Sequence, residues 1–445
     1  MNDQNLLFPL PEYSFESNTV SSPIGKPRVK SPTRNQIEFV HLSLDDLIPD
    51  DHQVRNIWFY INQMDLSLFF NKILSRSCNP GRPATDPKIL LALWIYAIVE
   101  GIGSARIINR YCIEHLAFKW LCGGVAVNYH TISDFRKNNS EEFDELISQI
   151  ISRLIHKDLI SLKRVSQDGM RVRASAGTSS FRRKLTLKDS LKIAREQVSA
   201  LKDELDEDTT ACLNRKSAAK KRAADDRLKR LTEAVEEHKK SVINLANSKK
   251  KHRKKLTEEE KAEVRCSTTD PKARKMKMNH GGFSPAYNFQ ITVDTESRFI
   301  IGNYVTNRGS DYGELLPMFN KIKEKHRKIP QQWLVDQGYL DHQDIIKIQK
   351  SGCKVYVNPK EKSSKNEPQH GEDNQLGEWR VRMGLDESKE IYKDRASNSE
   401  WVNACMRNRG LNRILVRGIK CVSSVLNLHV LTHNISRAIR LGYSY

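Results

Sequence analysis

The sequence predicts a mixed α/β protein with an all-α amino-terminal region and a long helical insertion in its sheet-forming part. Helical apolar patterns fill residues 39–140, whereas short β-capable runs alternate with helices over residues 160–445, which indicates an α/β sheet. Between the first two of these runs, residues 187–263 lack glycine and proline and carry leucines at roughly helical spacing. This pattern predicts a long helical hairpin inserted into the sheet-forming part.

The composition limits the class of protein. The chain has 445 residues, of which 38% are hydrophobic and 29% are charged, so a folded core is expected and a wholly disordered chain is excluded. The longest apolar run, residues 89–99, is too short to cross a hydrocarbon layer of roughly 30 Å. The first residues lack the basic start and apolar stretch of a secretory signal, so we expect a cytoplasmic protein.

The charge balance favours a polyanionic partner. The 74 Lys and Arg residues exceed the 54 Asp and Glu residues by 20, and neutralising phosphates releases condensed counterions, which gives affinity without sequence readout. Nucleic acid is therefore the first candidate, and a merely basic soluble protein is the alternative. The eight cysteines include no pair at CxxC spacing, so buried free thiols are expected.

The amino-terminal part divides into an arm and a helical region. Residues 1–38 hold five prolines among serines and asparagines, which predicts a flexible arm. In the helical region, residues 39–140, Thr85 or Asp86 is a good N-cap for a helix that begins at Pro87. The next helix is expected to begin at Ser104.

The sheet-forming part begins at Arg164. Its predicted elements are a strand over 164–174, two strands over 286–307 joined by a turn at 295–298, a helix over 313–326, an apolar run at 333–339, a helix from Asp341 and a strand over 353–359. A polar, less ordered stretch is expected over 360–378, followed by helices to the carboxyl end.

The helical insertion contains a dense basic block. The six basic residues are Lys249, Lys250, Lys251, Arg253, Lys254 and Lys255. Such a block is often only a solvated helix surface. In a chain with this excess of positive charge, a contact with DNA phosphates is the other interpretation.

Three acidic residues lie where an α/β sheet would bring them together. Asp168 lies in the first strand, although the dipeptide Asp168-Gly169 is also typical of a hairpin turn. Asp336 follows an apolar run at the point where a strand ends, and such edges hold the ligand sites of open α/β sheets. Its alternative is a solvated turn residue.

Glu400 lies in a polar helix and shares one face with Asn403 and Arg407. A surface stripe of salt bridges is the alternative for that face. Together, Asp168, Asp336 and Glu400 could hold two Mg²⁺ ions, because hard cations prefer oxygen ligands and paired metals stabilise phosphoryl displacement. Arg395 and Arg407 would then contact phosphates by bidentate hydrogen bonds.

The chain resembles the DDE-type insertion-sequence transposases. DLIPDDHQVR at 46–55, GRPATDPKILLALWIYA at 81–97 and YHTISDFRK at 129–137 are similar to the amino-terminal domain of the insertion-sequence-five group. SQDGMRVRASAGTSSFRRKLTL, TTDPKARKMKMNHGGFSPAYNFQITVD, VDQGY and YKDRASNSEWVNACMRNRGL resemble the branch numbered eleven-eighty-two. The resemblance extends from about residue 39 to residue 438.

The resemblance implies an RNase H-like catalytic domain whose metal-binding acids are Asp168, Asp336 and Glu400, with two Mg²⁺ or Mn²⁺ ions. Around the last acid, the family signature Tyr-x2-Arg-x3-Glu-x6-Lys matches Tyr392 and Arg395, which are expected near DNA. Glu400 follows Arg395 after four residues and not three, and Arg407 replaces the lysine. The competing acids are Asp270, Asp294 and Asp311, of which Asp311 is the strongest rival.

The function implied by the resemblance is transposition of a mobile element. The helical domain would bind the terminal repeats of the element, and the catalytic domain would cut DNA and join the freed 3′-OH to target DNA, with two or more protomers pairing the ends. Two alternatives remain at this point: a non-catalytic DNA-binding or architectural protein, and an RNase H-like nuclease that cuts without joining.

Overall fold

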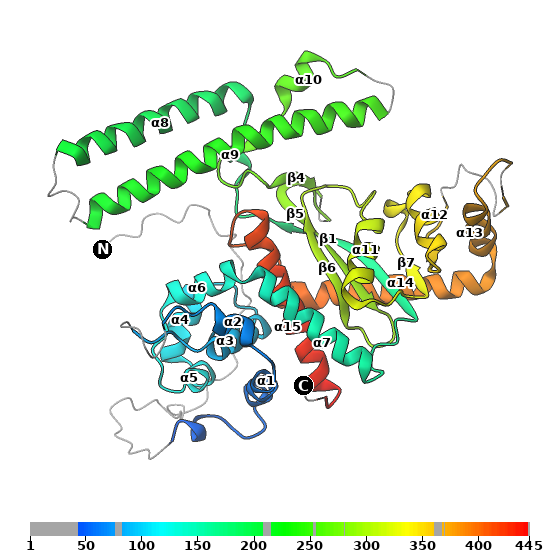
Figure 1. Cartoon of the computed structure of the whole chain (residues 1–445), viewed down its shortest axis with the longest axis horizontal. Coiled ribbons are helices and arrows are strands. Elements are labelled where there is room, and N and C mark those ends of the chain that lie inside the picture. The colour runs from blue at the N-terminus through cyan, green and yellow to red at the C-terminus, as the bar shows by residue number, and fades with distance from the viewer. Residues whose placement is uncertain are drawn as a thin grey trace, which may run out of the picture. The chain divides into compact units, whose positions relative to one another are not determined.

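The computed structural model describes residues 43–75, 82–207, 215–251, 255–279, 281–359, 367–368 and 370–443 (Figure 1). Residues 43–445 form one compact unit of mixed α/β structure. The predicted arm, residues 1–38, lies outside the described residues. No helix in the described ranges is long and apolar enough to cross a membrane.

The described residues before the sheet are helical. The elements are a 3₁₀ turn η1 (Asp45–Leu47) and helices α1 (Gln53–Asn62), α2 (Ser67–Asn71), α3 (Pro87–Val99), α4 (Ala105–Glu114), α5 (Leu116–Cys122), α6 (Tyr129–Asn138) and α7 (Ser140–His156). The expected helix starts are found, since Asp86 caps α3 by accepting from Lys88 N at 2.7 Å and Ser104 precedes α4. Nearly all of α3 is buried, so it forms the centre of this helical region.

The main sheet contains six strands. They are β1 (Arg164–Arg173), β4 (Arg274–Lys277), β5 (Phe283–Asp294), β6 (Ile300–Thr306), β7 (Gln332–Leu334) and β8 (Lys354–Tyr356), in the order β4-β5-β1-β7-β8 with β6 also paired to β5. β1 is antiparallel to β5 along most of its length but parallel to β7 over three residues only. Strand β1 runs through Asp168 and Gly169, so the alternative of a hairpin turn at this dipeptide is excluded.

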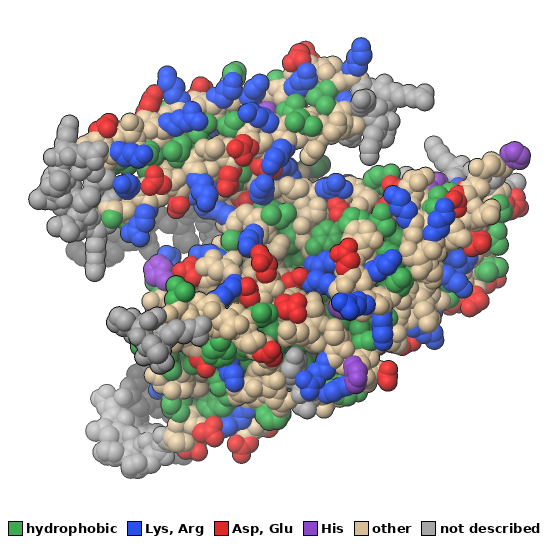
Figure 2. Space-filling view, in the orientation of Figure 1, with side chains coloured by type: hydrophobic (Ala, Val, Ile, Leu, Met, Phe, Trp, Pro, Cys, Tyr) green, Lys and Arg blue, Asp and Glu red, His purple; other side chains and the backbone are tan. Residues whose placement is uncertain are grey.

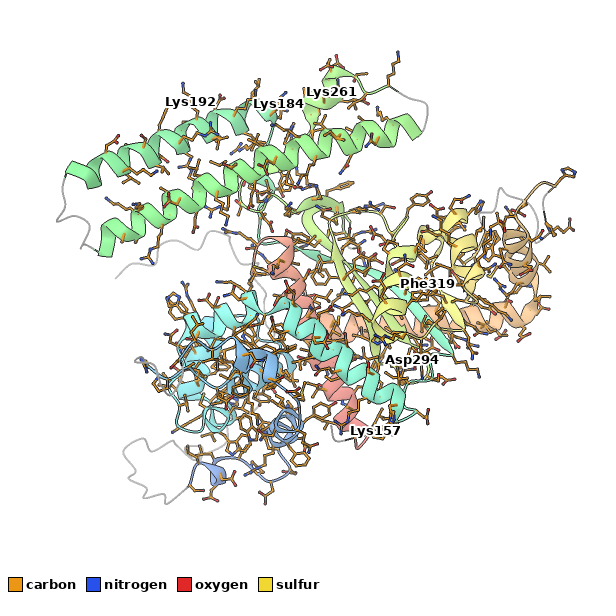
Figure 3. The ribbon with its side chains drawn as sticks, viewed as in Figure 1. Lys157, Lys184, Lys192, Lys261, Asp294 and Phe319 are labelled. Carbon is orange, nitrogen blue, oxygen red and sulfur yellow. The ribbon has the colours of Figure 1, made fainter. Side chains whose placement is uncertain are left out.

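Helices cover both faces of the sheet. On one face lie α14 (Asp386–Asn408) and α15 (Ile419–Arg440), joined to the strands through the hydroxyls of Ser166 and Ser399 and through Asn303 and Asn427. On the other lie α11 (Leu315–His326) and α12 (His342–Lys350). Phe319 of α11, labelled in Figure 3, packs on Trp333 with ring centroids 5.7 Å apart. The sheet centre is therefore buried on both sides.

Helix α13 (Asn374–Gly384) corrects one expectation of the sequence. Its first residues fall within 360–378, which were expected to be less ordered. Asp373 caps the helix by accepting from Gln375 N at 2.9 Å, and Trp379 is fully buried. The polar composition of residues 360–378 gave no sign of a helix, although Asp373 is a typical N-cap and the large apolar Trp379 follows directly.

The insertion forms the expected hairpin. Helices α8 (Lys184–Glu207) and α9 (Arg215–Lys251) lie side by side, followed by the short α10 (Glu258–Glu263), and a small two-stranded sheet of β2 (Phe181–Arg182) and β3 (Cys266–Ser267) lies at its base (Figure 1). Apolar side chains, Leu191, Ala194 and Leu231 among them, form the seam between α8 and α9. Figure 2 shows Lys and Arg side chains intermixed with Asp and Glu over the hairpin.

One buried glutamate attaches the hairpin to the main sheet. The Glu237 carboxylate on α9 accepts hydrogen bonds from Lys272 at 2.6 Å, from Arg274 of β4 at 2.8 Å and from Lys240 at 3.2 Å. Its side chain is only 6% exposed. We call these four residues the Glu237 anchor.

Candidate active site

Strand register brings Asp168 and Asp336 to the same edge of the sheet. The last parallel pair between β1 and β7 is Ser166 with Leu334, and each aspartate lies two residues beyond its member of that pair. β7 ends there, and Asp336 caps the 3₁₀ turn η4 (Gln337–Tyr339) by accepting from Gly338 N at 2.8 Å. Asp336 therefore follows the carboxyl end of β7, where ligand sites of such sheets lie. Asp168 occupies the equivalent position within β1, which continues to Arg173.

The Asp168 carboxylate is held by two donors. Its Oδ1 accepts from Gly169 N at 2.9 Å, and its Oδ2 accepts from Asn403 Nδ2 of α14 at 2.8 Å. The sequence predicts Asn403 on a polar helix face but does not predict this hydrogen bond. A polar residue one turn after Glu400 was the available signal.

The surroundings of Asp168 and Asp336 disfavour a negative charge on both carboxylates at once. Burial raises the pKa of Asp168 to about 6, and the charge of Asp336 contributes to that rise, while the Arg395 guanidinium acts in the opposite direction. Burial also raises the pKa of Asp336, and the charge of Asp311 adds to that effect. Like charges in a partly desolvated site favour protonation or a bound cation.

Helix α14 runs along β1 and is fixed at several points. Ser399 Oγ and Ser166 Oγ are 2.6 Å apart, Tyr392 Oη donates to Val335 O at 3.0 Å, and Arg164 forms an ion pair with Asp394. Val335 directly precedes Asp336. The helix is therefore positioned against both strands that carry the acids.

Glu400 is not brought together with the two aspartates. Successive helical residues turn by about 100°, so Glu400 lies beside the α14 face on which Ser399 contacts β1, and its side chain is exposed. Among the described residues, no group of three or more His, Cys, Asp or Glu side chains lies close enough to hold a metal ion. The structure thus assembles two of the three predicted acids.

The basic and aromatic residues expected near DNA lie on the same helix. The Arg395 guanidinium lies 5.6 Å from the centre of the Tyr392 ring, and its charge lowers the pKa of both Asp168 and Asp336. Arg407 lies one turn beyond Asn403 and is half-buried. Of these residues, Arg395 is the one whose positive charge acts on the pKa of both aspartates.

The basic block of the insertion is described in part only. Lys249 forms an ion pair with Glu260 of α10, and Lys255 is exposed. Arg253 and Lys254 lie outside the described residues, as do the side chains of Lys250 and Lys251. The contact of this block with phosphates stays a prediction.

The three rival acids differ in their surroundings. Asp270 is buried and accepts from Tyr287 Oη at 2.8 Å and from Gly418 N at 3.2 Å, whereas Asp294, at the end of β5 (Figure 3), accepts from Ser297 in the following turn. Both residues therefore hold the fold together. Asp311 lies near Asp168 and Asp336, since its charge raises the pKa of both.

A large hollow lies elsewhere in the described part of the chain. It has a volume of about 1150 Å³, and its walls come from the helical region, with Phe69, Asn109 and Asn128 among them. The candidate acids Asp168 and Asp336 and the rival acids do not line it. Volume alone therefore does not mark the site that the strand register defines.

Comparison with known proteins bears on the helical region. Residues 42–138 match the family model described as Transposase domain (DUF772). This match supports membership of an insertion-sequence transposase family. No curated protein and no solved structure matches the chain. The matched residues include α1 to α6, directly before the helix that leads into the sheet.

Proposed function

We propose that the chain is a DDE-type transposase with an RNase H-like catalytic domain, of the branch numbered eleven-eighty-two. It binds double-stranded DNA at the ends of an insertion sequence through the helical region and catalyses strand cleavage and strand transfer in the cytoplasm. The observation that carries the proposal is the position of Asp168 and Asp336 at equivalent places on neighbouring parallel strands. The transposase-domain match supports the same class of protein.

The donor chemistry fits Mg²⁺ or Mn²⁺. Asp168 and Asp336 supply hard oxygen donors, and Glu400 on α14 supplies the third. Within the described ranges, neither of these partly buried aspartates has an ion-pair partner, which favours a cation between them. When bound, two ions stabilise the attacking and leaving oxygens of a phosphodiester.

The protein's own groups orient the acids and the DNA. Asn403 fixes the Asp168 carboxylate, and the η4 turn fixes that of Asp336. Arg395 receives a phosphate next to the acids by charge-assisted hydrogen bonds. Glu400 joins the acids by turning its exposed side chain on a helix whose backbone is already held against β1.

Cleavage of end-containing DNA tests the proposal. The purified chain is incubated with DNA that flanks its own gene, in Mg²⁺, in Mn²⁺ and in Ca²⁺. Cleavage is expected with Mg²⁺ or Mn²⁺, whereas Ca²⁺, with its looser coordination, supports binding only. Activity that survives exhaustive chelation, or that needs Zn²⁺, contradicts the proposal.

The same assay separates the alternatives. A non-catalytic architectural protein would bind the DNA and leave it intact under every metal. A nuclease of this fold would cut the DNA but give no joined product with a target plasmid. Joined products in which the two element ends are paired in one complex support a transposase acting as a homo-oligomer.

A further inference from the structure

Asp311 is held in a fixed position beside the two catalytic candidates. It lies between β6 and α11, and its Oδ1 accepts hydrogen bonds from Asn288 Nδ2 at 2.7 Å and from Gln290 Nε2 at 2.8 Å, both on β5. Its Oδ2 accepts from Arg171 Nη2 of β1 at 3.4 Å. Both carboxylate oxygens are thus engaged by protein donors.

The glycine that follows Asp168 makes room for this carboxylate. A Cβ atom at Gly169 would lie 2.2 Å from Asp311 Oδ1 and 2.8 Å from Gln290 Nε2, which is closer than real Cβ atoms approach such neighbours. Gly169 lies within a regular strand, so space and not backbone conformation is the reason for glycine here. Asp311 therefore packs against the backbone next to Asp168.

A buried amide network connects Asp311 to the elements that carry both acids. Gln290 Oε1 accepts from Tyr339 Oη at 2.6 Å and from Gln167 Nε2 at 3.0 Å. Tyr339 belongs to η4, which Asp336 caps, and Gln167 precedes Asp168 on β1. Asp311 is thus linked through Gln290 to residues adjacent to both acids.

The charge of Asp311 reaches the same groups. It raises the pKa of Asp168, of Asp336 and of the fully buried Tyr339. Arg171 is its only ion-pair partner in the described part of the chain, at 3.4 Å. Asp311 thus adds a partly compensated negative charge to the edge of the sheet.

We propose that Asp311 is a positioning residue that strengthens divalent-cation binding at Asp168 and Asp336 through its charge and its fixed place, without being a metal ligand. This inference rests on the proposed function. The fixed charge of Asp311 is already oriented before a cation arrives, so it attracts the ion at no cost in reorganisation. Its oxygens stay with Asn288, Gln290 and Arg171.

The test is Mn²⁺ binding by the full chain, measured without DNA from the electron paramagnetic resonance signal of free Mn²⁺. Asp311→Asn is expected to raise the Mn²⁺ concentration at half-saturation about tenfold, because it removes one partly compensated negative charge near the ion, with the number of bound ions unchanged. Asp336→Asn is expected to remove binding. The matched control Asp294→Asn, a buried and hydrogen-bonded aspartate at the far end of β5, is expected to leave binding unchanged.

A second variant separates charge from structural support. Arg171→Gln removes the partner of Asp311 and is expected to tighten Mn²⁺ binding about threefold, because the negative charge is then less compensated. A merely structural role predicts weaker binding for both variants. Thermal unfolding of each variant shows whether it is folded.

The outcomes distinguish this inference from the proposed function. Parental Mn²⁺ affinity in Asp311→Asn overturns the inference, and so does complete loss of binding, which would make Asp311 a ligand. A parent chain that binds Mn²⁺ but never cuts end-containing DNA overturns the proposed function, while the effect of Asp311→Asn on Mn²⁺ affinity still supports the role of Asp311. A parent chain that binds no Mn²⁺ overturns both.

Discussion

The buried Glu237 and the partly buried Asp168 and Asp336 have opposite electrostatic surroundings. At the Glu237 anchor, burial raises the pKa of the carboxyl, but hydrogen bonds from Lys272, Arg274 and Lys240 outweigh burial and hold the pKa at about 2. At the sheet edge, burial and a neighbouring aspartate raise the pKa of Asp168 to about 6. Glu237 forms ion pairs with three cations, whereas Asp168 and Asp336 form none among the residues that the structure describes.

This difference is the one expected between an acid that holds the fold together and an acid that binds a ligand. A buried charge that is paired and hydrogen-bonded fixes two elements together, whereas a partly desolvated charge without an ion-pair partner is a cost to the folded state. Such a cost is typical of sites that bind a cation or transfer protons. The contrast therefore supports a ligand-binding role at Asp168 and Asp336 and a purely mechanical role at Glu237.

The strongest test of the contrast is catalytic. Asp168→Ala, Asp336→Ala or Glu400→Ala is each expected to lower strand cleavage by at least about a thousandfold, since in the proposed mechanism bound ions supply several kcal/mol of transition-state stabilisation. Binding to end DNA should survive in all three variants, measured by gel shift beside the cleavage assay. Retained cleavage in Asp336→Ala would contradict the assignment of the catalytic acids.

The anchor is expected to show the reverse behaviour. Glu237→Gln should lower the free energy of unfolding by about 3 kcal/mol, because Lys272 and Arg274 lose their common partner. Cleavage per folded molecule should stay within about twofold of the parent. Urea unfolding checks the first expectation, with the neighbouring Glu236→Gln, at a less buried position, as the matched control. Equal stability of the two variants would contradict a structural anchor.

The pH dependence of stability should have opposite signs at the two places. The pKa of Glu237 is lowered from 4.5 to about 2, so its contribution is present above pH 4.5 and is lost as the pH falls towards 2. The pKa of Asp168 is raised from 3.8 to about 6, so its contribution is present below pH 3.8 and is lost as the pH rises through 6. The two windows overlap little.

Unfolding curves in chelator, recorded from pH 3 to pH 7, check both signs. Asp168→Asn is expected to gain about 1–3 kcal/mol of stability over the parent as the pH rises from 4 to 6. The deficit of Glu237→Gln should shrink as the pH falls below 4.5. A stability gain for Asp168→Asn that does not change with pH would show that its charge is compensated in the folded protein.

The sequence predicts local features of the contrast but not its long-range contacts. Asp336 follows a short apolar run and Asp168 lies in a β-capable one, so the sequence predicts which carboxylates lie in or directly after a strand. Glu237 lies in the insertion and contacts Lys272 and Arg274, which follow the insertion in the chain. No residue spacing predicts this contact. The hydrogen bonds of Asn288 and Gln290 with Asp311 could not be predicted either. Polar residues at alternate positions of a buried strand did, however, indicate buried polar contacts.

The rotation of α14 was the least predictable feature. Glu400, Asn403 and Arg407 share a helix face in sequence, but a rotation of the helix by a few tens of degrees decides which of them reaches β1. Packing of Ser399 on Ser166 fixes that rotation. As a result Asn403, and not Glu400, forms the hydrogen bond with Asp168. Side-chain packing between distant segments decides this, and it cannot be predicted from periodicity.

The smallest expected effect concerns the basic block of the insertion. Lys249 is paired with Glu260 in a partly exposed ion pair, so Lys249→Gln should change DNA affinity little. Replacing Lys250, Lys251, Arg253 and Lys254 by Gln should lower the slope of log affinity against log salt by about one unit for each phosphate that the block no longer neutralises, equally for end DNA and random DNA. A salt titration of this variant against the parent and Lys249→Gln measures the slopes. An unaltered slope rejects the binding of phosphates by this block even if the variant transposes poorly, because a solvated helix surface releases no counterions from DNA.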